Sequence, residues 1–209
     1  MLFSLKLDHL VVTARTLEEG AAYVEAVLGV RLSPGGHHPH MGTHNLLLSL
    51  GPGEYLEVIA IDPEAAAPDQ PRWYDLDRFS VAPRMTHWAC RTDDLDEATA
   101  AAPEGTGRIL ELERGDLRWA MAVPDDGRLP FDSAMPALIE WDQGSPHPAE
   151  RLPDHNLRLA RLDVFHPEAE RLRDAFPALA TLPHVTVQPG PEKRLIATIS
   201  TPEGTRVLA

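Results

Sequence analysis

Short runs of apolar and β-branched residues, separated by turn residues, dominate the first part of the chain. The run LKLDHLVV at 5–12 predicts a strand, and TLEEGAAYVEAVLG at 16–29 predicts a helix with Thr16 as N-cap and Gly29 as C-cap. A further strand is expected after the helix. The stretch HNLLLSLGPGEYLEVIAID at 44–62 then predicts two strands joined by a Gly-Pro-Gly turn. Together these elements predict a βαβββ module.

The same pattern occurs again later in the chain, which indicates an internal repeat. When His87 is placed on His9, MTHWACRTDDLDEA aligns with LDHLVVTARTLEEG, and the helix follows the strand at the same distance. Downstream, GRILELERGDLRWAMAVP predicts two strands and PALIEWD a fourth, in which Glu140 falls where Glu57 falls in the first copy. A second βαβββ module is therefore predicted.

A third, weaker copy closes the chain at 155–209. LRLARLDVFHPEAERLRDAF predicts a strand and a helix, with Arg161 in the position of the two histidines, and two or three short strands follow. The segments 62–83 and 143–154 are rich in Pro, Asp and Glu and are interpreted as connections.

These patterns predict an α+β fold with a mixed sheet. One domain, residues 1–142, is expected to pair the modules 1–62 and 84–142. The degenerate third module of βαβ type, 155–209, is expected to pack on it.

Composition narrows the choice of partners. The chain has 209 residues, 43% of them hydrophobic, and a net charge of -13, which disfavours nucleic acid and anionic membranes. The single cysteine, Cys90, cannot form an intrachain disulfide, and the sequence contains no signal-peptide or membrane-span pattern. We expect a cytoplasmic monomer or homodimer that acts on a small molecule.

The chemistry is predicted from ionisable residues that recur once per inner strand. Strand alternation puts His9 and His87 on one face of their strands, and Glu57 and Glu140 occupy matching fourth strands. Each alone is compatible with a hydrogen-bonded core residue. In two equivalent copies, the four side chains are predicted to converge and to leave open positions on a divalent transition-metal ion.

The paired modules, with LDHLVV and MTHWAC as first strands and YLEVIAID and LIEWD as fourth strands, resemble the vicinal oxygen chelate superfamily and its glyoxalase-like branch. The resemblance covers residues 5 to 142. It implies a cup-shaped barrel around a metal such as Zn, Ni, Mn or Fe, held by one His and one Glu from each module. On this sequence the implied ligands are His9, Glu57, His87 and Glu140.

Several functions fit this resemblance. The first is a metal-dependent isomerase or lyase that acts on a small oxygenated substrate, with the metal as Lewis acid and Glu57 or Glu140 as base. The second is a metal-free protein that binds or sequesters a small molecule or drug. The third is an extradiol dioxygenase, for which His9, His87 and Glu140 would form a facial triad.

The stretch GGHHPHMGTHN at 35–45 is predicted to be a turn-rich loop before the third strand. It is compatible with a solvated loop, with a lid, or with a separate zinc site, which we rank last because no cysteine accompanies it. As a lid, it would bring His44 and Asn45 to the cleft and His37, His38 or His40 to the substrate. Trp119 is predicted to line the cleft, with packing in the core as the alternative.

Overall fold

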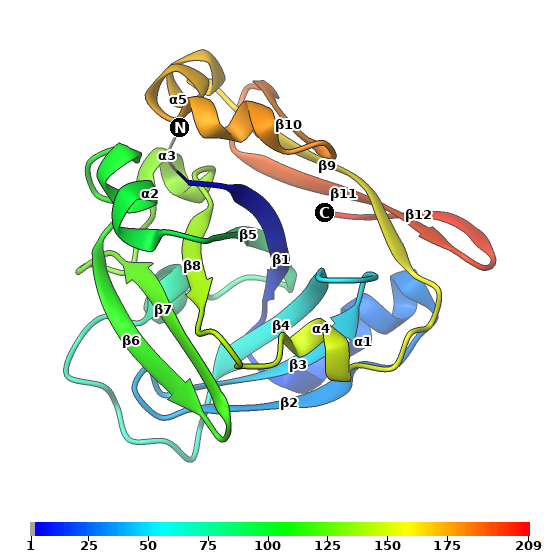
Figure 1. Cartoon of the computed structure of the whole chain (residues 1–209). Coiled ribbons are helices and arrows are strands. Elements are labelled where there is room, and N and C mark those ends of the chain that lie inside the picture. Colours follow the sequence, from blue (N-terminus) through cyan, green and yellow to red (C-terminus); the bar gives the residue numbers. More distant parts are fainter. Residues whose placement is uncertain (1–2) are drawn as a thin grey trace.

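The computed structural model describes residues 3–209, which fold into an α+β protein with two sheets (Figure 1). Two βαβββ modules supply the larger sheet, as predicted. The first comprises β1 (Leu5–Thr13), α1 (Leu17–Leu28), β2 (Ser33–His38), β3 (Thr43–Ser49) and β4 (Tyr55–Ile61). The second comprises β5 (Arg84–Thr92), α2 (Leu95–Ala101), β6 (Arg108–Arg114), β7 (Leu117–Val123) and β8 (Ala137–Trp141).

The larger sheet has the strand order β2-β3-β4-β1-β5-β8-β7-β6. In each module the first strand pairs in parallel with the fourth, and the modules meet where β1 runs antiparallel to β5. The sheet curls around a concave interior, in agreement with the predicted cup (Figure 1).

The chain ends in a second, four-stranded sheet. It is built from β9 (Arg158–His166), α5 (Ala169–Ala175), β10 (Val185–Pro189), β11 (Arg194–Thr201) and β12 (Gly204–Leu208), in the order β10-β9-β11-β12. Here β10 lies beside β9 and parallel to it, as expected for a βαβ unit. In the first two modules the strand after the helix lies at the far edge instead, so the third unit has its own topology.

Local signals explain the helix boundaries. The Thr16 side chain accepts a hydrogen bond from the Glu19 backbone N–H at 3.2 Å, and Gly29 ends α1 with a φ of 71°. Asp94 caps α2 in the same way through the Glu97 N–H. The histidine-rich stretch differs from its prediction, because most of it is strand: β2 runs through His38 and pairs with β3, which begins at Thr43.

The two faces of the larger sheet carry separate apolar cores. The outer face packs against the helices and the second sheet in one large cluster, which includes Trp88 and Cys90. The concave face holds a second cluster, in which Trp73, Tyr74 and Leu76 pack among the inner strand residues. These three come from η1 (Trp73–Arg78), within the segment predicted to be a connection. That segment therefore fills part of the cup.

The two ends of the curled sheet, β2 and β6, meet through a side chain. Arg114 of β6 reaches across, and its Nη1 donates to His38 Nε2 at 3.0 Å and to Asn45 Oδ1 at 3.2 Å. A Cβ at Gly36 would lie 2.8 Å from Arg114 Cδ, so this glycine allows the close approach. We call this contact the seam.

Four short elements complete the fold. They are η1, α3 (Pro130–Ser133), α4 (Pro148–Arg151) and η2 (Pro177–Thr181). Among the described residues, no helix has both the length and the apolar character needed to cross a membrane.

Candidate functional site

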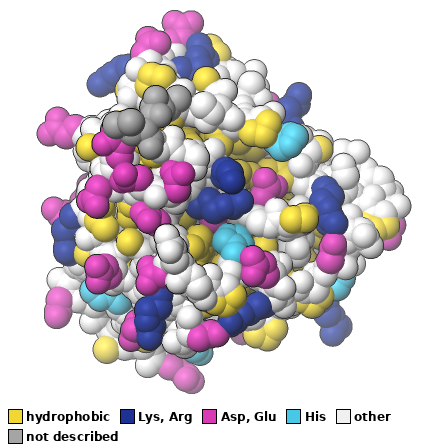
Figure 2. Space-filling view, viewed as in Figure 1, with side chains coloured by type: hydrophobic (Ala, Val, Ile, Leu, Met, Phe, Trp, Pro, Cys, Tyr) yellow, Lys and Arg dark blue, Asp and Glu magenta, His cyan; other side chains and the backbone are white. Residues whose placement is uncertain are grey.

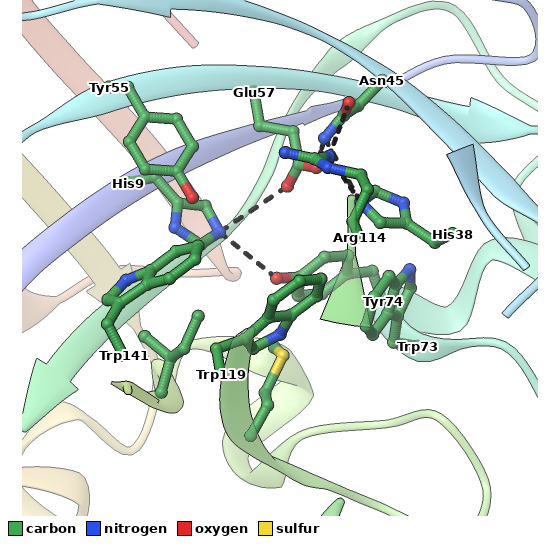
Figure 3. Close-up of a pocket in the computed structure, with 12 residues that line it drawn as sticks. His9, His38, Asn45, Tyr55, Glu57, Trp73, Tyr74, Arg114, Trp119 and Trp141 are labelled. Atoms are coloured by element: carbon green, nitrogen blue, oxygen red, sulfur yellow. Dashed lines mark hydrogen bonds and ion pairs between the residues drawn. The ribbon is translucent and has the colours of Figure 1, made fainter. Parts of the chain in front are cut away.

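His9 and Glu57 face each other in the concave interior (Figure 3). They come from the parallel strands β1 and β4, whose register pairs Val11 with Glu57. His9 Nε2 lies 3.6 Å from Glu57 Oε2, and the side chains are only 4% and 7% exposed. Two of the four predicted metal ligands are thus brought together.

Asp8 fixes the orientation of the His9 ring. A β-bulge lies between Leu7 and His9, and the Asp8 carboxylate accepts a hydrogen bond from His9 Nδ1 at 2.6 Å. It also accepts from His147 Nε2 at 2.9 Å and from Trp141 Nε1 at 3.0 Å. Burial raises the pKa of Asp8, but the hydrogen bonds from His147 and His9 outweigh it and hold the pKa well below its usual range. An ionised Asp8 requires a proton on His9 Nδ1, so a neutral His9 turns the lone pair of Nε2 toward Glu57.

Glu57 is held by its second oxygen. Asn45 Nδ2 donates to Glu57 Oε1 at 2.5 Å, and Asn45 Oδ1 in turn accepts from Gly36 N at 2.8 Å and from Arg114. His38 belongs to the same network: burial, followed by the charge of Arg114, lowers its pKa to about 3. A neutral His38 is the form that can accept from Arg114, so the seam and the Glu57 carboxylate belong to one polar network.

Aromatic rings enclose this pair of side chains. Tyr55 stacks on His9 with ring centroids 4.7 Å apart, and the Tyr74 hydroxyl lies 3.4 Å from His9 Nε2. Burial raises the pKa of both tyrosines well above the usual value, so both phenols stay protonated. Tyr74 has a φ of 60°, a strained conformation for a non-glycine residue.

The site consists of two adjoining cavities. The inner one, beside His9 and Glu57, has a volume of about 30 Å³. The outer one, of about 330 Å³, shares His38, Trp73 and Trp119 with it and is also lined by His40. Of the predicted substrate-binding residues, Asn45, Trp119 and His40 line these cavities.

His87 does not reach this site. Tyr74 lies between the two histidines, with its hydroxyl at His9 and its ring 4.8 Å from the His87 ring, centroid to centroid. The predicted convergence of His9 and His87 on one metal ion is therefore not formed in this structure.

Glu140 lies on the opposite face of the sheet, so the prediction that it joins the other three is wrong. Its Oε2 accepts a hydrogen bond from the backbone N–H of Leu95, at the start of α2. Strand β8 explains the error: Ala137 and Ile139 belong to the concave core, whereas Glu140 alternates with them. In the strand register, Val11 pairs with Glu57 and Ala89 with Ala137, so Ala137 is the structural counterpart of Glu57.

The donor set does not fit the predicted metal centre. His9 and Glu57 offer two donors, whereas catalytic zinc sites use three protein ligands. The facial triad of His9, His87 and Glu140 expected of a dioxygenase is likewise not assembled.

Another group of donors does gather, on the outer face of the first module. His37, His44 and Asp62 place ligand atoms within 4.8 Å of one another, and His37 Nδ1 lies 2.6 Å from Asp62 Oδ2. His44 pairs with His37 across β2 and β3, and its neighbour Asn45 points into the cup. The predicted contact of His44 with substrate is therefore wrong. The cluster lies where the separate zinc site, the last-ranked alternative for residues 35–45, was predicted.

Sequence reasoning missed several members of the site. Asp8 stands beside His9 within the quoted LDHLVV, and a buried acid next to a histidine was an available signal. Tyr74 and Arg114 carried no such signal, because Tyr74 comes from a Pro-rich segment and Arg114 from the end of a strand with no motif around it.

The comparisons with known proteins agree with the fold. The sequence matches the family of the glyoxalase-like domain over residues 7–180. The chain belongs to this family. The resemblance to the vicinal oxygen chelate superfamily is thereby confirmed, and the match extends past residue 142 into the third unit. No curated protein sequence matches the chain.

A solved structure with low sequence identity shares the fold. A hypothetical protein from Staphylococcus aureus is 11% identical, with a TM-score of 0.60 over 91% of this chain and 88% of that chain. Methylmalonyl-CoA epimerase from Mycobacterium tuberculosis is 18% identical, with a TM-score of 0.42 over 65% and 85% of the two chains. A Streptomyces coelicolor methylmalonyl-CoA epimerase in complex with 2-nitronate-propionyl-CoA is 18% identical, with a TM-score of 0.41 over 65% and 94%. The coverage of the Staphylococcus protein includes part of the third unit.

Charge is spread over the surface. Lys and Arg side chains are scattered among Asp and Glu on the face shown in Figure 2 and do not gather in one basic patch there.

Proposed function

We propose that this chain is a glyoxalase-like enzyme, an isomerase or lyase, that moves a proton on a small oxygenated substrate. The observation that carries the proposal is the facing pair of His9 Nε2 and Glu57 Oε2, 3.6 Å apart and almost fully buried. Both side chains are held from behind, His9 by Asp8 and Glu57 by Asn45. Two proton-carrying groups with fixed orientation are what general acid–base catalysis requires.

Glu57 is the base in this proposal. Its Oε2 removes a proton from a carbon next to a carbonyl group of the substrate, and Asn45 keeps Oε1 in place. His9 is the second proton carrier, because its Nε2 faces the cavity and the Asp8 carboxylate stabilises the imidazolium that forms. The protonated Glu57 then returns the proton to a neighbouring substrate carbon, which completes an isomerisation. In an elimination, the electron pair of the broken C–H bond expels a leaving group from the neighbouring carbon, and this group takes the proton.

Arg114 supplies the positive charge that the developing oxyanion needs. Its guanidinium lines the inner cavity from the seam, in a buried network where charge interactions are strong. The sequence analysis assigned this role to a metal ion; the position of Arg114 on the wall of the inner cavity supports its assignment to this residue instead.

The substrate is proposed to occupy the outer cavity and to extend its reacting end into the inner one. A volume of about 330 Å³ lies within the range of small-molecule sites, whereas about 30 Å³ takes only a few atoms. His40 and Trp119 would contact the outer part of the substrate, and Asn45 the reacting end.

Proton exchange tests the proposal without knowledge of the product. A panel of 2-oxo acids, 2-hydroxy acids and aldehydes is incubated with the protein in D₂O, and loss of C–H signals is followed by NMR. Glu57→Gln should slow exchange by roughly 10²–10⁴-fold, the usual contribution of a general base. Glu140→Gln is the matched control, a carboxylate on the other face of the sheet, and should exchange at the wild-type rate. Equal rates in wild type and Glu57→Gln would refute the assignment.

Metal dependence is measured in the His37→Ala/His44→Ala variant, in which ions on the outer cluster do not interfere. Exchange is expected to persist after chelation. Exchange that disappears with chelator and returns with Zn, Ni, Mn or Fe would restore the predicted metal enzyme. Saturable binding without exchange would favour the metal-free binding protein, and oxygen uptake with catechols and Fe(II) would favour the dioxygenase.

A further inference from the structure

A second cavity lies on the far side of Tyr74 from the site described above. Its volume is about 210 Å³, and it is bounded by β5, by the segment after η1, by α3 and by the turn between β10 and β11. Lys193, from that turn, belongs to the third unit, so the cavity is completed only by the C-terminal sheet. This cavity has no part in the proposed proton transfer. Of the residues that line the inner cavity of the first site, it shares only Tyr74.

His87 contributes an unpartnered polar atom to this cavity. The residue is only 4% exposed, its Nδ1 lies 2.9 Å from Thr86 Oγ1, and its Nε2 finds no hydrogen-bond partner among residues 3–209. Thr13 Oγ1 lies 2.5 Å from Thr86 Oγ1. If Thr13 donates to Thr86 and Thr86 donates to Nδ1, His87 Nε2 carries a proton and lacks an acceptor. A buried donor without a partner destabilises the folded protein, and a bound acceptor would remove this cost.

The charges that line the cavity are unbalanced toward the positive. Among the described residues, Arg84 and Lys193 form no ion pair, and the Lys193 ammonium donates to the Thr86 carbonyl. Of the two acids that line the cavity, Asp75 pairs with Arg78 at 2.6 Å, and Asp132 is largely exposed, with its Oδ2 3.5 Å from His166 Nε2. Two cations without carboxylate partners are notable in a chain with a net charge of -13.

Strained backbone borders the same cavity. Tyr74 and Asp75 have φ values of 60° and 52°, and Asp132 and Ser133 have values of 51° and 67°. Strain of this kind clusters at ligand sites. These strained residues form part of the wall of this cavity.

The geometry points to a binding site for the carboxylate group of a small organic acid. Its oxygens would lie between Arg84 and Lys193 and accept the hydrogen bond from His87 Nε2. Phe79 and Val81, which also line the cavity, suit a short hydrocarbon part. A carboxylate supplies both the negative charge and the acceptor that this cavity lacks.

The test is a titration with propionate at constant ionic strength, followed by NMR of ¹⁵N-labelled histidine rings. The His87 signals are assigned with His87→Gln. They should shift and saturate on addition of propionate. Inorganic phosphate is titrated in parallel; tighter binding of phosphate would overturn the carboxylate assignment.

Variants identify the cations that bind the carboxylate. Arg84→Met and Lys193→Met should each weaken binding by about tenfold or more, equivalent to about 1.4 kcal/mol. Lys193→Arg keeps the charge and should stay within a few-fold of wild type. Arg31→Met, at an exposed position outside this cavity, is the control and should bind as wild type does.

Two outcomes overturn the inference. One is the lack of any saturable shift of the His87 signals in wild type. The other is equal affinity in wild type and Arg84→Met, which would mean that the shift arises elsewhere. Because Arg84 is exposed at the start of β5, its variant is expected to fold even if Lys193→Met does not.

Discussion

Asp8 offers the sharpest test of how the site is held together. Replacement by Ala removes the acceptor for three donors, the ring nitrogens of His9 and His147 and the indole N–H of Trp141. Asp8 itself is fully buried, and Arg91 Nη1 lies 3.6 Å from its Oδ2. Breaking a buried charged network by removal of one partner costs about 3–5 kcal/mol. We expect Asp8→Ala to lose stability in this range.

Asp8→Asn is the graded variant. It keeps the volume and one acceptor oxygen but loses the charge and turns an amide N–H₂ toward donors, so a loss of about 1–3 kcal/mol is expected. Urea unfolding followed by tryptophan fluorescence measures both variants. A loss of stability within about 0.5 kcal/mol of zero for Asp8→Ala, the range of ordinary surface substitutions, would refute this account of the site.

The pH dependence of stability provides a second test of the role of Asp8. Because the pKa of folded Asp8 lies well below the ordinary value of 3.8, its contribution to stability is complete above pH 3.8 and is lost as the pH falls through the folded pKa. The stability difference between wild type and Asp8→Asn should therefore be flat from neutral pH to about pH 4 and should narrow at lower pH. A difference that already narrows between pH 7 and pH 5 would contradict this assignment.

Three further predictions concern the packing around the sheet. The Cys90 thiol is buried, and burial raises its pKa, so it should react with a thiol reagent only at the rate of unfolding; rapid modification of the native protein would contradict this. Glu140→Gln should cost less than about 1 kcal/mol in urea unfolding, because the amide oxygen can still accept from Leu95 N–H and only the charge at the start of α2 is lost. Gly20→Ala should lower the thermal midpoint of unfolding, because the new Cβ would lie 2.3 Å from Val58 Cγ1. The overpacking costs about 1–3 kcal/mol, which outweighs a gain of about 1 kcal/mol in helix propensity. An unchanged midpoint would show that α1 can shift to make room for the methyl group.

Periodicity was sufficient to predict the two modules and the caps of α1. The signals for α1, from Thr16 to Gly29, are local, and the repeat around His9 and His87 reinforces them. Strand alternation also placed Glu57 correctly in the cup, because β4 pairs regularly with β1. These features depend on neighbours in sequence.

The residues that make up the site could not all be predicted, because they depend on the register of β8 and on the segment that contains Tyr74. Sequence equivalence aligned Glu140 with Glu57, but the face that a strand residue presents changes with a shift of one position. The strand pairing puts Ala137 there instead. Tyr74 separates His9 from His87 only because a Pro-rich segment folds back into the cup, and no local pattern specifies that.

The seam determines how the molecule can open. A barrel closed by a continuous backbone ladder must break many hydrogen bonds before it widens. Here β2 and β6 stand at opposite ends of the strand order, and the described contacts across the gap include the Arg114 guanidinium on His38 and Asn45. An anion that draws Arg114 away would remove the contact with His38 and Asn45 across the gap. Because Asn45 also donates to Glu57, the same movement would free the Glu57 carboxylate from part of its support. Entry of a negatively charged molecule would therefore be coupled to the mobility of Glu57.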